Sequence, residues 1–98
     1  MSSTRLTHED FQPHVGREFR FGEQPQVLRL SRIDVGHSPP LPGMEYQSFA
    51  LVFAGPRGDV LPEGFYAAEA EGGARFDLYI LPIHTPAPDR QEYQAVFN

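Results

Sequence analysis

Four side chains near the N-terminus form the densest group that could bind a metal ion: His8, Glu9, Asp10 and His14. Imidazole and carboxylate groups are common zinc ligands. On a helix, however, His8 and Asp10 would point to different sides, and Pro13 interrupts the i, i+4 spacing that would add a third ligand. We therefore expect a solvated, capped helical turn here, with no metal or other cofactor.

Carboxylates flank a Gly72-Gly73 pair and could divide the acid and base roles of a glycosidase. They are Glu69, Glu71 and Asp77. That chemistry needs a cleft that raises the pKa of one carboxyl group, and the tip of a hairpin is open to water. The sequence therefore predicts no catalytic carboxylate pair.

Nucleophilic catalysis has no local motif either. Ser31 and Ser48 lie in no GxSxG sequence, and His37 and His84 stand alone in segments that read as loops. With no catalytic residue indicated, we expect a protein that is not an enzyme.

Composition excludes further classes of function. The 98 residues hold 8 basic and 13 acidic side chains, a formal net charge of −5 that disfavours binding to a phosphate backbone. There is no cysteine, so disulfides and thiolate metal sites are excluded. No apolar run is long enough to cross a bilayer and no secretory signal is visible, so we expect a cytoplasmic chain without membrane insertion. Export by a route that needs no signal peptide stays open.

The elements that must position any site are short strands. Ten Pro and nine Gly separate short runs in which apolar residues alternate with other residues. This two-residue period is typical of a strand with one buried face. Thr7 can cap one short N-terminal helix. We predict a single all-β domain over residues 1–98, a six-stranded, mostly antiparallel sandwich or partly open barrel. The predicted strands are residues 17–21, 27–35, 46–54, 65–70, 74–83 and 92–98.

Two of these strands and one turn carry specific predictions. In residues 27–35 the alternation slips, and one extra residue near Ser31 and Arg32 would restore it, which predicts a β-bulge. In residues 46–54 both faces are apolar, which predicts a central strand covered on both sides. Gly72-Gly73 predicts a hairpin between the fourth and fifth strands.

Four segments resemble a family of short bacterial proteins that carry a domain of unknown function. They are FALVFAGP at Phe49 to Pro56, LPEGFY at Leu61 to Tyr66, FDLYILPI at Phe76 to Ile83 and the ending YQAVFN at Tyr93 to Asn98. The resemblance covers residues 6–98. It implies a chain of about this length with no assigned activity and a loose association with phage-tail-collar-like proteins. Ala67-Ala68-Glu69 departs from the family pattern, which has longer polar side chains and a His there.

The apolar residues exceed what one small core can bury. If the inward positions of the last strands fill the core, then Val52, Tyr79, Leu81, Ile83 and Val96 fall on the opposite face. Either the N-terminal helix and loops cover that face, or it is an exposed surface that contacts another subunit.

We therefore expect a structural or interaction module that assembles with itself or with a partner protein, through an apolar sheet face or a strand edge. The expected interface residues are Tyr79, Leu81, Ile83, Tyr93 and Val96, with Pro39, Pro40 and Leu41 of a Pro-rich loop. The alternative is a small-molecule or carbohydrate-binding barrel whose pocket is lined by Tyr46, Tyr66 and Tyr79.

Overall fold

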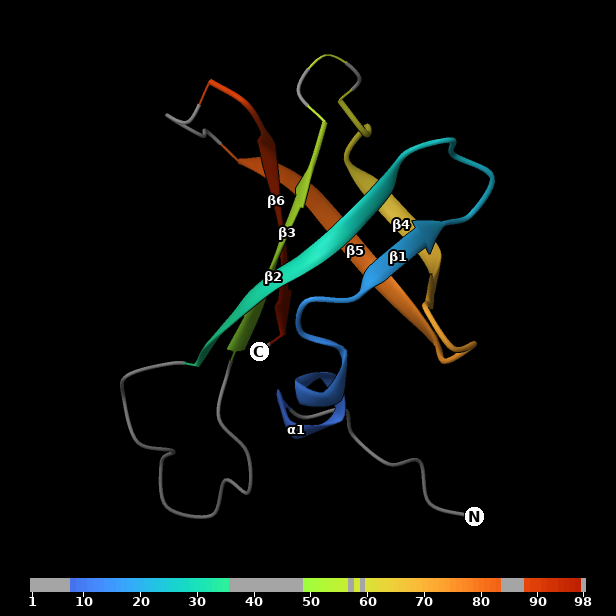
Figure 1. Ribbon diagram of the computed structural model, residues 1–98, viewed down its shortest axis with the longest axis vertical. Helices are drawn as coiled ribbons and strands as arrows, with labels where there is room; N and C mark the ends of the chain where they lie inside the picture. The colour runs from blue at the N-terminus through green and yellow to red at the C-terminus, as the bar shows by residue number, and fades with distance from the viewer. Residues whose placement is uncertain (1–7, 36–48, 57, 59, 84–87, 98) are drawn as a thin grey trace.

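The computed structural model describes residues 8–35, 49–56, 58, 60–83 and 88–97 (Figure 1). This part of the chain forms one short α-helix, one 3-10 turn and six strands, which confirms the predicted all-β class and the short N-terminal helix. Thr7, the predicted cap, lies outside the described residues. The elements are α1 (His8–Phe11), η1 (Gln12–His14), β1 (Glu18–Phe21), β2 (Val27–Val35), β3 (Phe49–Gly55), β4 (Gly64–Ala70), β5 (Arg75–Ile83) and β6 (Gln91–Phe97).

The six described strands form a closed barrel in the order β1-β2-β3-β6-β5-β4. Neighbouring strands are antiparallel at every pairing, as predicted. The ring closes where β1, already paired with β2, also pairs with β4 through Phe19 opposite Ala70 and Phe21 opposite Ala68. Of the two predicted forms, a sandwich or a partly open barrel, the structure agrees with the barrel, and the described strands close it into a full ring.

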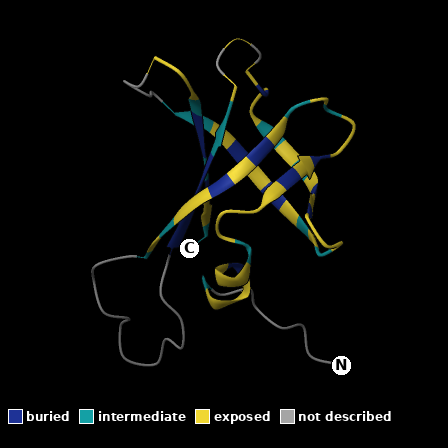
Figure 2. Cartoon of the chain, in the orientation of Figure 1, coloured by how far each residue is buried: buried dark blue, intermediate teal, exposed yellow. Residues whose placement is uncertain are grey.

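The barrel interior is filled by the inward residues of each strand, and buried and exposed bands alternate along β2, β4 and β5 (Figure 2). Aromatic rings form much of this core. Phe53 of β3 packs edge-on against Phe19 and Phe21 of β1, with ring centroids 5.2 and 5.3 Å apart. Such edge-to-face contacts add to the burial of apolar area.

The bulge predicted in β2 is present. Leu30 lies opposite Phe53 of β3, but the next pair is Arg32 opposite Val52, so one residue of β2 has no partner. Because side chains alternate with a period of two, this extra residue moves the inward positions from Leu30 to Ile33. Ile33 packs against the core as a result.

Strand β3 is central and covered on both faces, as predicted. Its inward side chain Leu51 is fully buried, and the outward Ala50 and Val52 are buried too. Val52 lies between Arg32 of β2 and Gln94 of β6 in the register. Since its outward side chains are small, β3 can lie beneath its neighbours' longer ones.

Helix α1 lies at one end of the barrel (Figure 1). Its only buried residue among the four, Phe11, places its ring 4.6 Å from that of Phe76, 5.5 Å from Phe97 and 6.0 Å from Phe49, measured between centroids. These partners come from β5, β6 and β3, so one side chain joins three strands to the helix.

The hairpin between β4 and β5 turns at Gly72 and Gly73, as predicted. Both have positive φ angles, 101° and 104°, a backbone region that glycine enters without the steric cost borne by other residues. The hairpin sets Phe65 of β4 opposite Tyr79 of β5.

Candidate functional site

Two aromatic side chains stand together on the outer surface of the barrel. Phe65 is 78% exposed and Tyr79 is 42% exposed, and they are direct cross-strand partners on β4 and β5. Their ring centroids are 4.9 Å apart with an interplanar angle of 75°, an edge-to-face arrangement. We call Phe65 and Tyr79 the aromatic pair.

The strand period explains why both rings point outward. Ala68 and Ala70 of β4 and Leu78 and Ile80 of β5 are buried in the barrel. Residues of the other parity on each strand must then face solvent. The aromatic pair thus follows from the same alternation that builds the core.

Three of the predicted interface residues share this outer face of β5. Tyr79 is followed by Leu81, which is 37% exposed, and by Ile83, which is half-buried. Leu81 and Ile83 lie opposite Gln94 and Glu92 of β6. The apolar surface therefore extends from the aromatic pair along β5 to its end.

The other predicted interface residues are placed differently. Val96 is 52% exposed on the outer face of β6. Tyr93 is fully buried, so its predicted place on the surface is wrong. It has the inward parity of Ala95 and lies opposite Phe53 in the core. Pro39, Pro40 and Leu41 lie outside the described residues.

The tyrosines of the alternative pocket do not converge. Tyr66 faces inward, with its ring 6.1 Å from that of Phe21, and its hydroxyl donates a hydrogen bond of 2.5 Å to the carbonyl oxygen of Pro62. Tyr79, on the neighbouring strand, faces outward. The two rings therefore lie on opposite faces of the sheet and line no common pocket. Tyr46 lies outside the described residues.

A carboxylate is bound to the aromatic pair. The Tyr79 hydroxyl donates a hydrogen bond to Oε2 of Glu63, immediately before β4. This hydrogen bond, with smaller contributions from partial desolvation and from the negative charge of Glu63, raises the pKa of Tyr79 above its ordinary value. The bond holds the Glu63 carboxylate beside the exposed ring.

The aromatic pair lies within segments that carried the family resemblance, LPEGFY and FDLYILPI. A domain of unknown function, DUF6916, matches residues 6–97, nearly the whole chain. The chain belongs to the DUF6916 family. No curated protein and no solved structure matches it.

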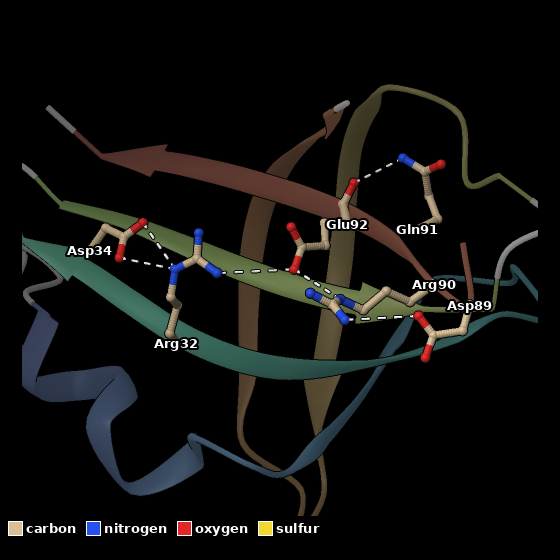
Figure 3. Close-up of polar contacts among 6 residues, drawn as sticks. All are labelled: Arg32, Asp34, Asp89, Arg90, Gln91 and Glu92. Carbon is tan, nitrogen blue, oxygen red and sulfur yellow. Dashed lines mark hydrogen bonds and ion pairs between the residues drawn. The ribbon is translucent and has the colours of Figure 1, made fainter. Parts of the chain in front are cut away.

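A second polar arrangement in this DUF6916 domain lies on the outer face of β2, β3 and β6 (Figure 3). The Glu92 carboxylate, whose side chain is 11% exposed, lies between two guanidinium groups. Its Oε2 is 3.2 Å from Nε of Arg90 and 4.0 Å from Nη1 of Arg32. Arg32 also pairs with Asp34, and Arg90 with Asp89. Because each charge has a partner within the group, we interpret it as a link between strands.

The acidic residues near the β4–β5 hairpin do not form one site. Asp77 lies opposite Ala67, whereas Glu69 lies opposite Arg75 on one side and Arg20 of β1 on the other. A surface hollow of about 410 Å³ includes Glu69 but not Asp77. The glutamates in the hollow are exposed, so it lacks the enclosure that paired-carboxylate chemistry needs. Its lining residues are Glu18, Arg20, Val27, Glu69, Ala70, Glu71, Gly72 and Gly73.

The N-terminal histidines of the DUF6916 domain contact aromatic rings. His14 lies edge-on to Phe19 and Phe76, at 5.9 and 5.7 Å between centroids, and His8 lies 6.2 Å from Phe49. Within the described ranges no three His, Cys, Asp or Glu residues are grouped to hold a metal ion. The same ranges contain no helix long and apolar enough to span a membrane.

Sequence reasoning missed two members of the surface in this DUF6916 domain, Phe65 and Glu63. The signal for Phe65 was present. Tyr66, Ala68 and Ala70 share one parity of β4 and pack inward, so Phe65, of the other parity, faces outward. Glu63 precedes the strand, and no period predicts its bond to Tyr79.

Proposed function

We propose that this protein is a non-enzymatic interaction module that binds a partner protein, or a second copy of itself, through the outer apolar face of β4 and β5. The observation that carries the proposal is the aromatic pair. Phe65 is 78% exposed and continues into exposed Tyr79 and Leu81 on the neighbouring strand, and it is such adjoining apolar side chains, more than a single exposed one, that mark interaction sites. Aromatic residues are enriched at the centres of protein interfaces, where a few of them supply most of the binding free energy.

The barrel topology favours the sheet face over strand addition. Each of the described strands has a neighbour on both sides in the closed ring. Strand addition requires an edge strand with unpaired backbone groups. Contact through side chains, with Phe65, Tyr79 and Leu81 at its centre, is therefore the mode that we propose.

The packing of the interior favours an interaction module over a small-molecule or carbohydrate-binding barrel. Large side chains, among them Phe19, Phe21, Phe53 and Tyr93, occupy the inside of the barrel and are fully buried. A barrel that binds a ligand within it keeps that space open.

The proposal includes the setting that the family resemblance implies. We place the protein in the bacterial cytoplasm, as a component of a larger assembly of the phage-tail type. An exposed aromatic surface on a folded barrel suits such a component, because most pre-organised interfaces change little in backbone when they are covered.

Site-specific photocrosslinking tests the proposal in cells that make the protein naturally. A photoreactive phenylalanine analogue replaces Phe65 in one strain and Val15, which is 42% exposed elsewhere on the molecule, in a control strain. We expect position 65, and not position 15, to give one discrete adduct that mass spectrometry identifies as a partner protein or as a dimer. Equal adduct patterns at the two positions, or none at position 65, would contradict the proposal.

Light scattering distinguishes the two candidate binding partners, a second copy of the chain and a different protein. The mass of the purified chain is measured over a concentration series, together with the masses of Phe65→Ser and of the control Val15→Ser, whose side chain is exposed away from β4 and β5. An oligomer that Phe65→Ser alone disrupts would identify the partner as a second copy. A monomer at every concentration would assign the crosslinked adduct to a different protein.

A further inference from the structure

The aromatic pair lies between two carboxylates. Glu63 precedes β4 on one side and is bound to the Tyr79 hydroxyl through Oε2. Asp77 is on the other side, two residues before Tyr79 on the same outward face of β5. It lies opposite Ala67, which has too short a side chain to cover it. The exposed rings are therefore bordered by negative charge at both ends.

On β4 and β5, positive charge lies farther from the aromatic pair. The nearest arginine along β5 is Arg75, beyond Asp77, and it lies opposite Glu69. Within the described part of the chain, Asp77 belongs to none of the ion pairs. The formal charge of the whole chain is −5, so the protein's net field adds to the local one.

This arrangement matches the requirements of a cation with an apolar stem. The faces of aromatic rings attract ammonium and guanidinium groups, and arginine stacks on them more often than lysine. A guanidinium can at the same time donate hydrogen bonds to neighbouring carboxylates. Because the Tyr79 hydroxyl is bound to Oε2 of Glu63, Oε1 of that carboxylate can accept a bond from a partner.

We infer that the partner contacts this surface with a basic segment, in which an arginine side chain packs against Phe65 and Tyr79 and pairs with Glu63 and Asp77. Aliphatic side chains next to that arginine cover Leu81. The inference rests on the proposed function, since it names the chemistry of the partner at the same surface.

Charge also argues against a second copy as the occupant. Two copies related by a twofold axis would place the same surface against itself. The carboxylates of Glu63 and Asp77 would then face carboxylates of the other copy, and the nearest arginine along β5 in each copy is Arg75, beyond Asp77. Like charges brought together in this way oppose association, whereas a basic partner removes the repulsion.

A display selection tests the inference with random peptides in place of the natural partner. Peptides of 12 residues are selected on the folded protein, and binders that also recognise Phe65→Ser are removed. We expect the remaining peptides to be enriched in arginine beside leucine, isoleucine or valine, and to bind less tightly as salt is added. Phe65-dependent peptides without basic residues would overturn the inference and leave the proposed function standing.

Charge-neutral variants supply the matched control. The double variant Glu63→Gln/Asp77→Asn should weaken binding of a selected peptide by about three- to thirtyfold, the effect of two exposed ion pairs. The double variant Glu9→Gln/Glu23→Gln has the same change in net charge at exposed positions on other elements, and it should leave the affinity unchanged. Equal weakening in both would show an effect of net charge alone and would overturn the inference.

The remaining outcomes separate the inference from the proposed function. A dimer that Phe65→Ser disrupts would identify a second copy as the occupant, which supports the proposed function and overturns the basic partner. If no peptide depends on Phe65 and position 65 gives no crosslink in cells, both fail. Circular dichroism of each variant confirms that lost binding is not lost folding.

Discussion

The backbone amide of Leu61 donates a hydrogen bond of 2.8 Å to the hydroxyl of Tyr93, and both residues are fully buried. The two are 32 positions apart in the chain. The bond ties the segment before β4 to the last strand. Tyr66 and Tyr79 bind the next two residues of that segment, Pro62 and Glu63. Three tyrosine hydroxyls thus fix the chain just before it delivers Phe65 to the surface.

Tyr93→Phe should lower the free energy of unfolding by about 1–3 kcal/mol, because it removes the acceptor of a buried amide. Denaturant unfolding measures this loss, provided that the slope of the free energy of unfolding against denaturant concentration is the same in both proteins. Tyr66→Phe is the control, since its hydroxyl binds the carbonyl of Pro62 at an exposed position, and it should cost less than about 1 kcal/mol. Equal losses in the two variants would contradict the role of burial.

The sequence alone predicted the strands well because their signal is local. A two-residue period, glycine turns and the shift of parity at Ser31 and Arg32 are all visible within one strand or hairpin, and each led to a correct element. The closure of the barrel between β1 and β4 is not local. Closure depends on whether the twist of the whole sheet brings its first and last strands together. The sequence therefore left the sandwich and the barrel as alternatives.

The candidate surface was predicted in part for the same reason. Tyr79, Leu81 and Ile83 were assigned to an outer face from the period of β5 alone, and the structure places them there. Tyr93 was assigned to the surface although its parity is that of the core residue Ala95, so that error could have been avoided. The group around Glu92 could not have been found, because Arg32 belongs to a strand distant in sequence and only the fold brings the two together.

Glu63→Ala should lower the pKa of Tyr79 toward its ordinary value of 10.0, because the carboxylate that accepts the hydroxyl proton in a hydrogen bond is gone. The pKa of Tyr79 is higher in the folded protein than in the unfolded chain. The hydrogen bond therefore contributes its full stabilisation at pH values below the pKa of the unfolded chain. The stabilisation is lost as pH rises through the raised pKa. NMR titration of the tyrosine ring carbons measures the shift. Glu71→Ala is the control, and a Tyr79 pKa that is the same in both variants would refute the assignment.

Glu92→Gln should destabilise the fold by about 1–2 kcal/mol, between the values for exposed and buried ion pairs. The carboxylate is nearly buried, but Arg32 and Arg90 are about half exposed, so water screens the charges that the substitution leaves behind. Glu18→Gln is the matched control. It breaks an exposed pair with Arg29, 4.0 Å apart, and should cost less than about 0.5 kcal/mol. Chemical denaturation at low and high salt should give a similar loss of free energy of unfolding for Glu92→Gln.

Phe65→Ser should change the free energy of unfolding by less than about 1 kcal/mol, because its ring is mostly in water and loses little beyond one cross-strand contact with Tyr79. Phe53→Ala is the contrast. That ring is fully buried against Phe19 and Phe21, and its removal should cost about 3–5 kcal/mol, enough to unfold much of a marginally stable domain. Thermal and denaturant unfolding of both variants would measure the difference. A large loss of stability in Phe65→Ser would mean that its exposed ring serves the fold, and the case for an interaction surface would then lose its main support.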